Sequence, residues 1–156
     1  MGYVLDTSAL VDAWTKWYSM RSIPRFWERL EQLAQASEAT LPDAVMLELE
    51  KIDDDLYRWC KAREQFLMTP TTPDIQAVIS DISNAYPNLR HSGPPGANFA
   101  DPVVIAHAEV RGFAVVTHEN ATGNLNGPRI PDVCKARGVR PMQIHHLIHE
   151  LGWTFG

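Results

Sequence analysis

Residues 3–12 read YVLDTSALVD, and the order of residue types in this stretch decides the fold. Tyr3, Val4 and Leu5 suit a buried strand, and this run stops at the carboxylate of Asp6. A carboxylate at the end of a buried strand is costly to desolvate unless it is paired, hydrogen-bonded or bound to a metal. The rest of the chain must therefore supply a partner for Asp6.

Helix and strand signals alternate along the chain. Helical spacing, with Ser8, Thr72 and Asp101 as expected N-caps, is found in residues 8–17, 24–36, 41–52, 53–66, 72–86, 101–111, 131–138 and 145–152. Short apolar runs predict strands at residues 3–5, 67–68, 113–117 and 142–144. Strands separated by helices imply a parallel sheet that is covered on both faces. In such α/β sheets ligands bind outside the carboxyl ends of the strands.

Length and composition are those of an ordinary globular protein. The 156 residues, of which 45% are hydrophobic and 21% charged, predict a single domain over residues 1–156. No apolar run is long enough to span a membrane and the N-terminus lacks a secretory signal, so we expect a cytoplasmic protein. Cys60 and Cys134 are expected to be reduced. The net charge of −5 argues mildly against binding a polyanion.

Four carboxylates are predicted to lie at strand ends or on inward helix faces. Asp6 ends the first strand, and Glu119 follows the strand at residues 113–117, so both lie at the ligand edge. At about 100° per residue, Asp101 points inward from its helix. By the same projection Glu48 leans toward the core and Glu50 toward water. The apolar stripe expected on that helix is Val45, Leu49 and Ile52.

Clustered carboxylates in an acidic protein indicate a cation. Like charges raise one another's pKa, and oxygen-liganded Mg²⁺ or Mn²⁺ reverses that effect. Each residue also has a simpler interpretation when it is taken alone: Asp101 as a helix cap, Glu48 as a solvated residue and Glu119 as a loop acid. The coincidence of all four favours a metal site that includes Asp6.

This pattern resembles the PIN domain nucleases. In that family an Asp ends the first strand, a Glu lies on a helix about forty residues later, an Asp opens a late helix, and an acid follows the next strand. Here VLDTSALVD supplies Asp6, LPDAVMLELE supplies Glu48, ADPVVIAHAEVRG supplies Asp101 and VVTHEN supplies Glu119. Glu stands where Asp is usual in the last motif, and the segment HENATGNLNGPRIPDVC, with the terminal HELGWTF, is similar to a PIN-like branch of unknown function.

The resemblance implies a three-layer α/β/α fold with a central parallel sheet. It also implies an endoribonuclease that depends on Mg²⁺ or Mn²⁺ and that is the toxin of a toxin–antitoxin pair, with an antitoxin encoded nearby. It leaves a homodimer open. The catalytic, metal-binding residues that it implies are Asp6, Glu48, Asp101 and Glu119, and Ser8 and Thr117 are expected to contact RNA. Arg90 and His91 are also expected to contact RNA, because they lie in the Gly- and Pro-rich loop that runs into Asp101. The alternative is a catalytically weak or inactive PIN-like module that binds RNA or a protein partner.

Other patterns leave further alternatives open. His145 and His149 have the i, i+4 spacing of zinc ligands, but position 146 is not the Glu of the metalloprotease motif. The strand followed by LDTS also suits an aspartyl phosphatase, although Ser8 replaces its second Asp. Five tryptophans could stack on bases or fill the core: Trp14, Trp17, Trp27, Trp59 and Trp153. Three arginines could hold phosphates or form a solvated face: Arg21, Arg25 and Arg29.

Overall fold

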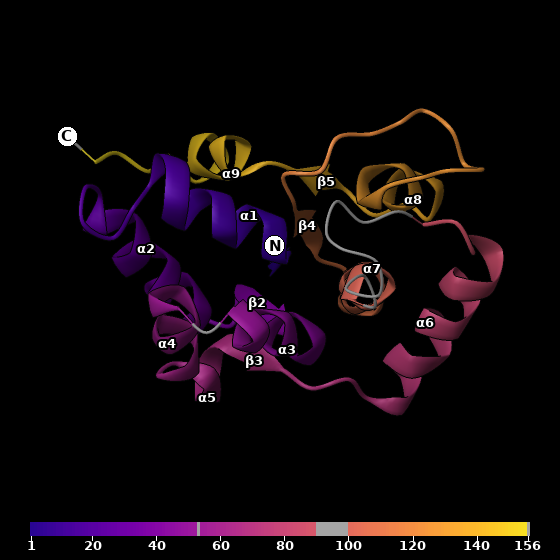
Figure 1. The fold of residues 1–156 in the computed structure, drawn as a ribbon, viewed down its shortest axis with the longest axis horizontal. Coiled ribbons are helices and arrows are strands. Elements are labelled where there is room, and N and C mark those ends of the chain that lie inside the picture. The colour runs from indigo at the N-terminus through magenta and orange to yellow at the C-terminus, as the bar shows by residue number, and fades with distance from the viewer. Residues whose placement is uncertain (53, 90–99, 156) are drawn as a thin grey trace.

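Short parallel strands form the centre of the molecule (Figure 1). The structure is a computed structural model that describes residues 1–52, 54–89 and 100–155. The strands are β1 (Tyr3–Leu5), β2 (Ala39–Pro42), β3 (Met68–Thr69), β4 (Ala114–Val116) and β5 (Pro141–Met142). They form a five-stranded sheet in the order β3-β2-β1-β4-β5, and every pair is parallel. The predicted central parallel sheet is confirmed.

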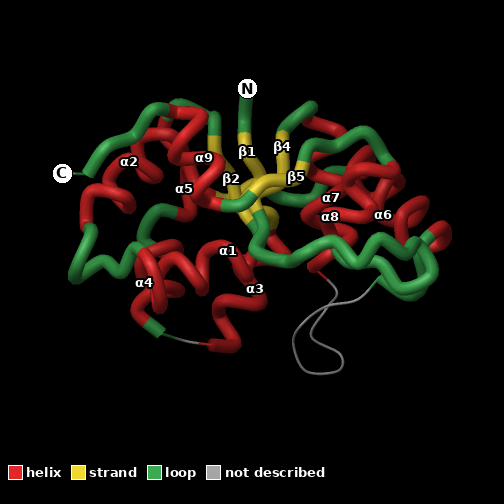
Figure 2. The backbone as a smooth tube through the Cα atoms, turned by 90° about the horizontal axis from the view of Figure 1, so that it is seen from above, coloured by secondary structure: helices red, strands yellow, loops and turns green. Residues whose placement is uncertain are grey.

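Helices cover both sides of this sheet. They are α1 (Thr7–Asp12), α2 (Pro24–Gln35), α3 (Asp43–Ile52), α4 (Asp55–Lys61), α5 (Glu64–Leu67), α6 (Pro73–Ala85), α7 (Ala100–Arg111), α8 (Ile130–Ala136) and α9 (Ile144–Leu151), with a π-helix η1 (Ala13–Trp17) after α1. Helices α6, α7 and α8 lie on one side of the strands, and α2, α5 and α9 lie on the other (Figure 2). This arrangement confirms the three-layer α/β/α class.

The strand order places the end of β1 at a turning point of the topology. Val4 pairs with Thr40 of β2 on one side and with Val115 of β4 on the other. The chain adds β2 and β3 to one edge of β1 and then crosses to add β4 and β5 to the opposite edge. In open α/β sheets the crevice for a ligand forms at such a switch point, outside the carboxyl ends of the strands. Asp6 is the residue that directly follows β1.

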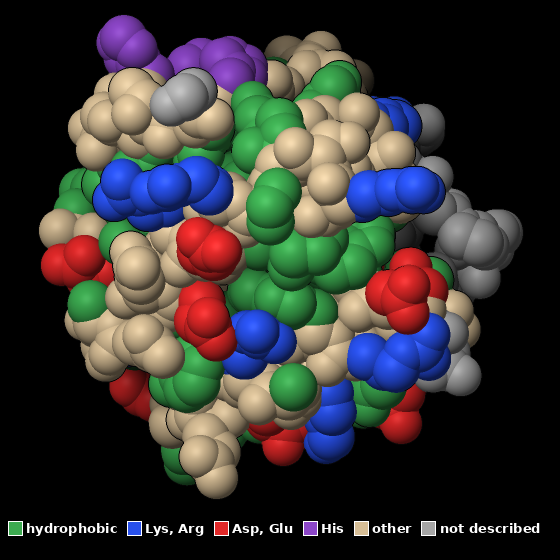
Figure 3. Space-filling view, turned by 90° about the vertical axis from the view of Figure 1, so that its left-hand side faces the viewer, with side chains coloured by type: hydrophobic (Ala, Val, Ile, Leu, Met, Phe, Trp, Pro, Cys, Tyr) green, Lys and Arg blue, Asp and Glu red, His purple; other side chains and the backbone are tan. Residues whose placement is uncertain are grey.

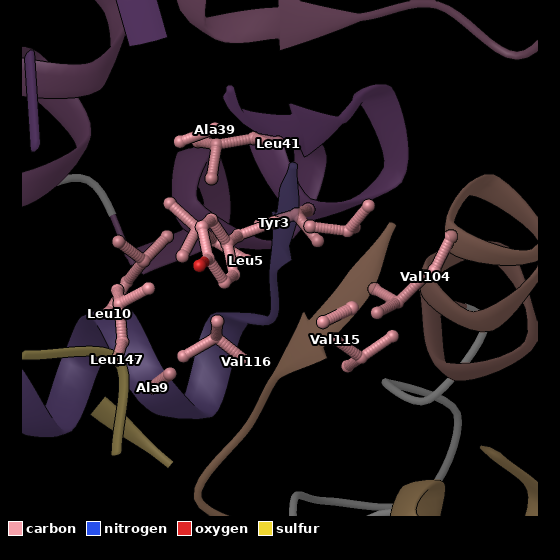
Figure 4. Close-up of a cluster of buried hydrophobic side chains, with 14 of the residues drawn as sticks. Tyr3, Leu5, Ala9, Leu10, Ala39, Leu41, Val104, Val115, Val116 and Leu147 are labelled. Atoms are coloured by element: carbon pink, nitrogen blue, oxygen red, sulfur yellow. The ribbon is translucent and has the colours of Figure 1, made fainter. Parts of the chain in front are cut away.

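The core fills both faces of the sheet. Val115 lies toward Val104 of α7, whereas Val116 lies toward Ala9 and Leu10 of α1 on the opposite side (Figure 4). Successive side chains of a strand point to opposite faces, so a strand that is covered on both sides is apolar throughout. All five of these side chains are almost completely buried. No helix in the described part of the chain is long and apolar enough to cross a membrane.

Two predicted helix starts differ from the structure, and a third agrees. Asp6, not Ser8, occupies the N-cap position of α1, because the helix begins at Thr7 and Ser8 lies inside its first turn. Helix α7 begins at Ala100, so Asp101 also lies within a first turn and is not the N-cap. Thr72 occupies the predicted N-cap position of α6, although its hydroxyl donates to the carboxylate of Asp74 and makes no capping bond to the backbone.

Two predicted helices have different bounds, and one strand was not predicted. Residues 39–42 form β2, and the helix expected over residues 41–52 begins only at Asp43. The helix expected over residues 53–66 is divided into α4 and α5, and the side chain of Asp54 caps α4 by accepting a hydrogen bond from the amide of Tyr57 at 3.1 Å. These differences leave the order of the elements unchanged.

A buried histidine joins α7 to the segment that follows β3. The side chain of His107 is fully buried, and its Nε2 lies 3.0 Å from the hydroxyl of Thr71. That hydroxyl donates to Asp43 Oδ1 at 2.8 Å. Burial lowers the pKa of His107 below its ordinary 6.5, the charge of Asp43 opposes that shift, and Arg111 adds to it. His107 is therefore a neutral member of this network near neutral pH.

We expect His107 to make the protein less stable in mild acid. The unfolded chain takes up a proton near the ordinary pKa of 6.5, whereas folded His107 does so only at lower pH. The free energy of unfolding therefore decreases as the pH falls from 6.5 through the folded pKa. The measurement is the urea midpoint between about pH 7.5 and about pH 5.5. His107→Gln should reduce this slope, whereas His149→Gln, an exposed control on α9, should not; equal slopes in both variants would contradict the assignment.

Candidate functional site

The carboxylate of Asp6 is held by two hydroxyl groups. Asp6 is 2% exposed, and its Oδ2 accepts hydrogen bonds from Ser8 Oγ at 2.7 Å and from Thr117 Oγ1 at 2.8 Å. The amide of His118 donates to Ser8 Oγ at 3.0 Å. Ser8, the expected helix cap, thus uses its hydroxyl to join the end of β1 to the segment that follows β4. These bonds give one structural reason for a charge at the end of a buried strand.

Glu48 reaches the same region from α3. It is 8% exposed, and its Oε1 accepts a hydrogen bond of 2.8 Å from Thr7 Oγ1, the residue next to Asp6. The inward direction predicted for Glu48 is confirmed, as is the exposure of Glu50. The apolar stripe is shorter than expected, because Ile52 is the last residue of α3 and is 50% exposed.

Asp101 and Glu119 are also buried. Asp101 has no exposed surface in the first turn of α7, a helix that contacts β1, β2, β4 and α3. Glu119 is 5% exposed, and its Oε1 accepts a hydrogen bond of 3.2 Å from the amide of Ile130 at the start of α8. Asp6 directly follows β1, Glu48 bonds to the residue next to Asp6, Asp101 lies on a helix that contacts β1, and Glu119 follows the neighbouring strand β4. All four predicted acids are buried.

The electrostatic environment of Cys134 supports this convergence. Burial raises the pKa of the Cys134 thiol, and the charges of Asp6 and Glu119 raise it further. Both carboxylates must lie near this thiol to act on it, although one follows β1 and the other follows β4. Cys60 and Cys134 are free, and both are completely buried. Burial also raises the pKa of Cys60, to about 12, so neither thiol is set up as a nucleophile.

The carboxylates of Asp6, Glu48, Asp101 and Glu119 are ligands of the type that a hard divalent cation prefers, but the described side chains do not form a preformed metal site. Carboxylate oxygens are the ligands that Mg²⁺ and Mn²⁺ prefer. Across residues 1–52, 54–89 and 100–155, no three His, Cys, Asp or Glu side chains are close enough together to hold one metal ion. Asp6, Glu48 and Glu119 instead accept hydrogen bonds from neighbouring hydroxyl and amide groups.

Asp132 organises the long segment after Glu119, a role that the sequence analysis missed. Its carboxylate accepts hydrogen bonds from the backbone amides of Thr122, Gly123 and Arg129, each at 2.9 Å. Burial raises the pKa of Asp132, but these amides lower it more, and the pKa lies below its ordinary value. Asp132 is the third residue of α8. From the sequence alone, an acid at this position indicates only a favourable charge at a helix start.

His118 is a second residue that the sequence did not single out. Its Nδ1 lies 3.2 Å from Asp12 Oδ2, and its Nε2 accepts a hydrogen bond of 3.4 Å from the amide of Ile144. Burial lowers the pKa of His118, while the charges of Asp12 and Asp6 oppose the shift. The partners lie on α1 and α9, so local sequence carries no signal for this contact.

Of the four residues predicted to contact RNA, two lie within the described part of the chain. Ser8 and Thr117 lie at the site, where both bind Asp6. Arg90 and His91 lie outside the described residues. Arg21 and Arg25 are exposed beside and on α2. On the face that includes α2 and α9, Lys and Arg side chains form separate groups among acidic and hydrophobic side chains (Figure 3). His145 and His149 are exposed on α9.

Comparison with known proteins places the chain in a family. Residues 3–155 match the model of a family described as "Domain of unknown function (DUF4411)". No curated protein sequence matches the chain at a significant level. Among solved structures, one similar to this chain is VapBC2 from Rickettsia felis, bound to a DNA fragment from its promoter. The TM-score is 0.54 at 14% identity, over 92% of this chain and 98% of that chain.

Two further structures are similar to the same extent. FitAcB from Neisseria gonorrhoeae has a TM-score of 0.53 at 14% identity, over 92% of this chain and 99% of that chain. FitAB bound to an IR36 DNA fragment has a TM-score of 0.52 at 15% identity, over 90% of this chain and 94% of that chain. Identities this low show a shared fold alone. The match over residues 3–155 shows that the chain belongs to the DUF4411 family, a PIN-like family. The structural neighbours show that it has the α/β fold of PIN domains.

Proposed function

We propose that this protein is an endoribonuclease that depends on Mg²⁺ or Mn²⁺ and hydrolyses phosphodiester bonds. The observation that carries the proposal is the burial of four acids, Asp6, Glu48, Asp101 and Glu119, at the end of β1, on helices α3 and α7, and after β4. Four shielded carboxylates on contacting elements repel one another, and a divalent cation relieves that repulsion. The resemblance to PIN domains supports the same chemistry.

The chain's own side chains would orient the reacting groups. The hydroxyls of Ser8 and Thr117 fix the direction of Asp6, and the amide of Ile130 fixes Glu119. Asp6, Glu48, Asp101 and Glu119 are the residues that would hold the cation. The chemistry that a divalent cation supplies at such a site is neutralisation of charge on the scissile phosphate and a more acidic water nucleophile.

We also propose that the protein is the toxin of a toxin–antitoxin pair. The structural neighbours are toxin–antitoxin complexes. An antitoxin encoded by an adjacent reading frame is the partner that this assignment requires, and a homodimer is its expected assembly. Co-expression with the product of that frame should yield a stable complex in which RNA cleavage is suppressed.

Cleavage of a mixed RNA pool by the purified protein tests the main proposal. The expected result is fragmentation in Mg²⁺ or Mn²⁺ and intact RNA in EDTA. An RNA pool that stays intact in both metals would contradict the nuclease assignment and favour the alternative, a PIN-like module that binds RNA or a protein without cleaving.

Divalent metal should stabilise the folded protein. A ligand at ten times its dissociation constant adds about 1.4 kcal/mol to the free energy of unfolding, which for a domain of this size raises Tm by roughly 3–6 °C. We would compare Tm in Mg²⁺, in Mn²⁺ and in EDTA. Glu50→Gln is the matched control and should retain the shift, since Glu50 is exposed on the same helix as Glu48. Equal Tm values in EDTA and at millimolar metal would count against the cation site.

A further inference from the structure

An exposed aromatic side chain contacts His118, the residue before Glu119. Trp17, the last residue of η1, is 54% exposed, whereas Trp27 and Trp59 are buried in the core and Trp14 packs against Trp27. An indole exposed to this extent leaves part of its aromatic face open to a ligand. The ring centroid of Trp17 lies 4.9 Å from that of His118, at an interplanar angle of 53°.

His118, which contacts the Trp17 ring, is itself held by two other elements. The side chain of His118 is 5% exposed and is held between Asp12 on α1 and the amide of Ile144 on α9. Its backbone amide donates to Ser8 Oγ, the hydroxyl that binds Asp6. The face of Trp17 that contacts His118 is thus tied, through one residue and one hydroxyl, to the carboxylate at the end of β1.

A cavity opens at this aromatic pair. It has a volume of about 310 Å³ and is lined by Trp17, Tyr18, His118, Gln143, Ile144 and His145. A space of this size lies at the lower limit of small-molecule sites and suits one nucleotide. Aromatic faces supply stacking that any base can use, and the Gln143 amide offers both a donor and an acceptor to a base edge.

Lysine side chains and Glu119 lie next to this cavity. Glu119 is one of the four buried acids, Asp6, Glu48, Asp101 and Glu119, which together are called the acid site. The ammonium group of Lys16 lies 6.0 Å from the centre of the Trp17 ring and pairs with Asp12 at 3.2 Å. A second cavity of about 310 Å³ shares Gln143 with the first and is lined by Thr117 and Glu119. Lys135 also lines this second cavity. Aromatic and cationic groups that follow one another in this way are typical of sites for single-stranded nucleic acid.

We propose that the cavity formed by Trp17 and His118 is a subsite for an unpaired base of RNA, next to the acid site. The base stacks on the open face of Trp17, Gln143 bonds to its edge, and the strand continues through the second cavity past Glu119. This inference rests on the proposed function for the identity of the strand. It makes single-stranded RNA the substrate class, because a base in a duplex cannot leave its stack to enter the cavity without loss of pairing.

Binding in EDTA at low ionic strength tests the subsite without cleavage. The probe is a labelled ten-nucleotide single-stranded RNA, compared with the same strand in a duplex. Trp17→Ala should weaken binding of the single strand by about 5- to 100-fold and leave duplex binding unchanged. Trp17→Phe, which keeps an aromatic face, should recover most of the affinity. Leu125→Ala, an exposed apolar control at 51% exposure, should have no effect.

A second experiment alters the RNA instead of the protein, by removing one base at a time. Strands with one abasic nucleotide, scanned along the sequence, should include a position at which the parent protein loses affinity and Trp17→Ala loses none further. Equal single-strand affinity in Trp17→Ala and the parent would overturn the subsite, as would equal losses for single strand and duplex. If Trp17→Ala keeps its RNA affinity but changes the sedimentation of the protein, the surface is a protein interface and the proposal is wrong.

The failure of this inference is distinguishable from the failure of the nuclease assignment. A parent protein that binds single-stranded RNA through Trp17 but does not cleave it supports the subsite and contradicts the nuclease. A parent that cleaves RNA with the same KM as Trp17→Ala supports the nuclease and contradicts the subsite.

Discussion

Replacing Asp6 or Asp101 with Asn is expected to lower metal-dependent RNA cleavage by orders of magnitude while the fold persists. Each substitution removes one negative charge from the buried acid group, so the affinity for a divalent cation falls. Asn keeps an acceptor oxygen that Ser8 and Thr117 can use at position 6. It also serves about as well as Asp at a helix N-cap, the position that Asp6 occupies. Stability of the metal-free protein should be unchanged or slightly higher, because one of several like charges has gone.

The measurements are cleavage of a mixed RNA pool in Mn²⁺ and Tm in EDTA. Glu50→Gln is the matched control, since it also removes a carboxylate but from an exposed position on α3. Full activity in both Asp variants, with an active parent, would refute the metal site. A large fall in the Tm of the metal-free variants would mean that these residues are structural.

Asp132→Ala should cost about 2–4 kcal/mol of stability and also lower cleavage. The substitution leaves the amides of Thr122, Gly123 and Arg129 without their acceptor, and an amide that loses its partner costs roughly 1–3 kcal/mol, less where water reaches it. The start of α8 is then less well held, and the amide of Ile130, which fixes Glu119, is part of that start. The hydrogen bonds of Asp132 at the start of α8 thus help to position Glu119.

Urea unfolding and RNA cleavage would be measured on the same Asp132→Ala sample. Asp81→Ala, at an exposed position of α6, is the control and should change the free energy of unfolding by less than about 0.5 kcal/mol. Wild-type cleavage in a clearly destabilised Asp132→Ala protein would show that Glu119 is placed without this segment. Equal stability of the two variants would contradict the role of Asp132 altogether.

The parts of the site that were predictable are those with a local signal. Asp6 stands out because a charge interrupts a buried apolar run, and Glu48 and Asp101 follow from the period of their helices. Strand β2 escaped notice because ATLP is short and runs directly into helix α3, and only its neighbours β1 and β3 make it a strand.

Contacts between distant segments left no such signal. The hydroxyl of Ser8 was expected to cap its own helix, but Asp6 takes the N-cap position and Ser8 bonds across the sheet. His118 meets Asp12 and Ile144 from other elements, and nothing near position 118 marks either contact. Local sequence patterns therefore identify the buried acids, whereas their hydrogen-bond partners depend on tertiary packing.

The pairing of β1 with β4 has a consequence for synthesis of the chain. Thr117 and Asp6, which share a hydrogen bond, are 111 positions apart, whereas Thr7 and Glu48 are 41 apart. The first strand therefore leaves the ribosome long before its partner β4 exists, and only the β3-β2-β1 part of the sheet can form early. Such long-range pairing forms slowly and exposes hydrophobic surface in the meantime. A nascent chain would hold Asp6 and Glu48 without Glu119, so translation itself delays completion of the acid site until β4 has been made.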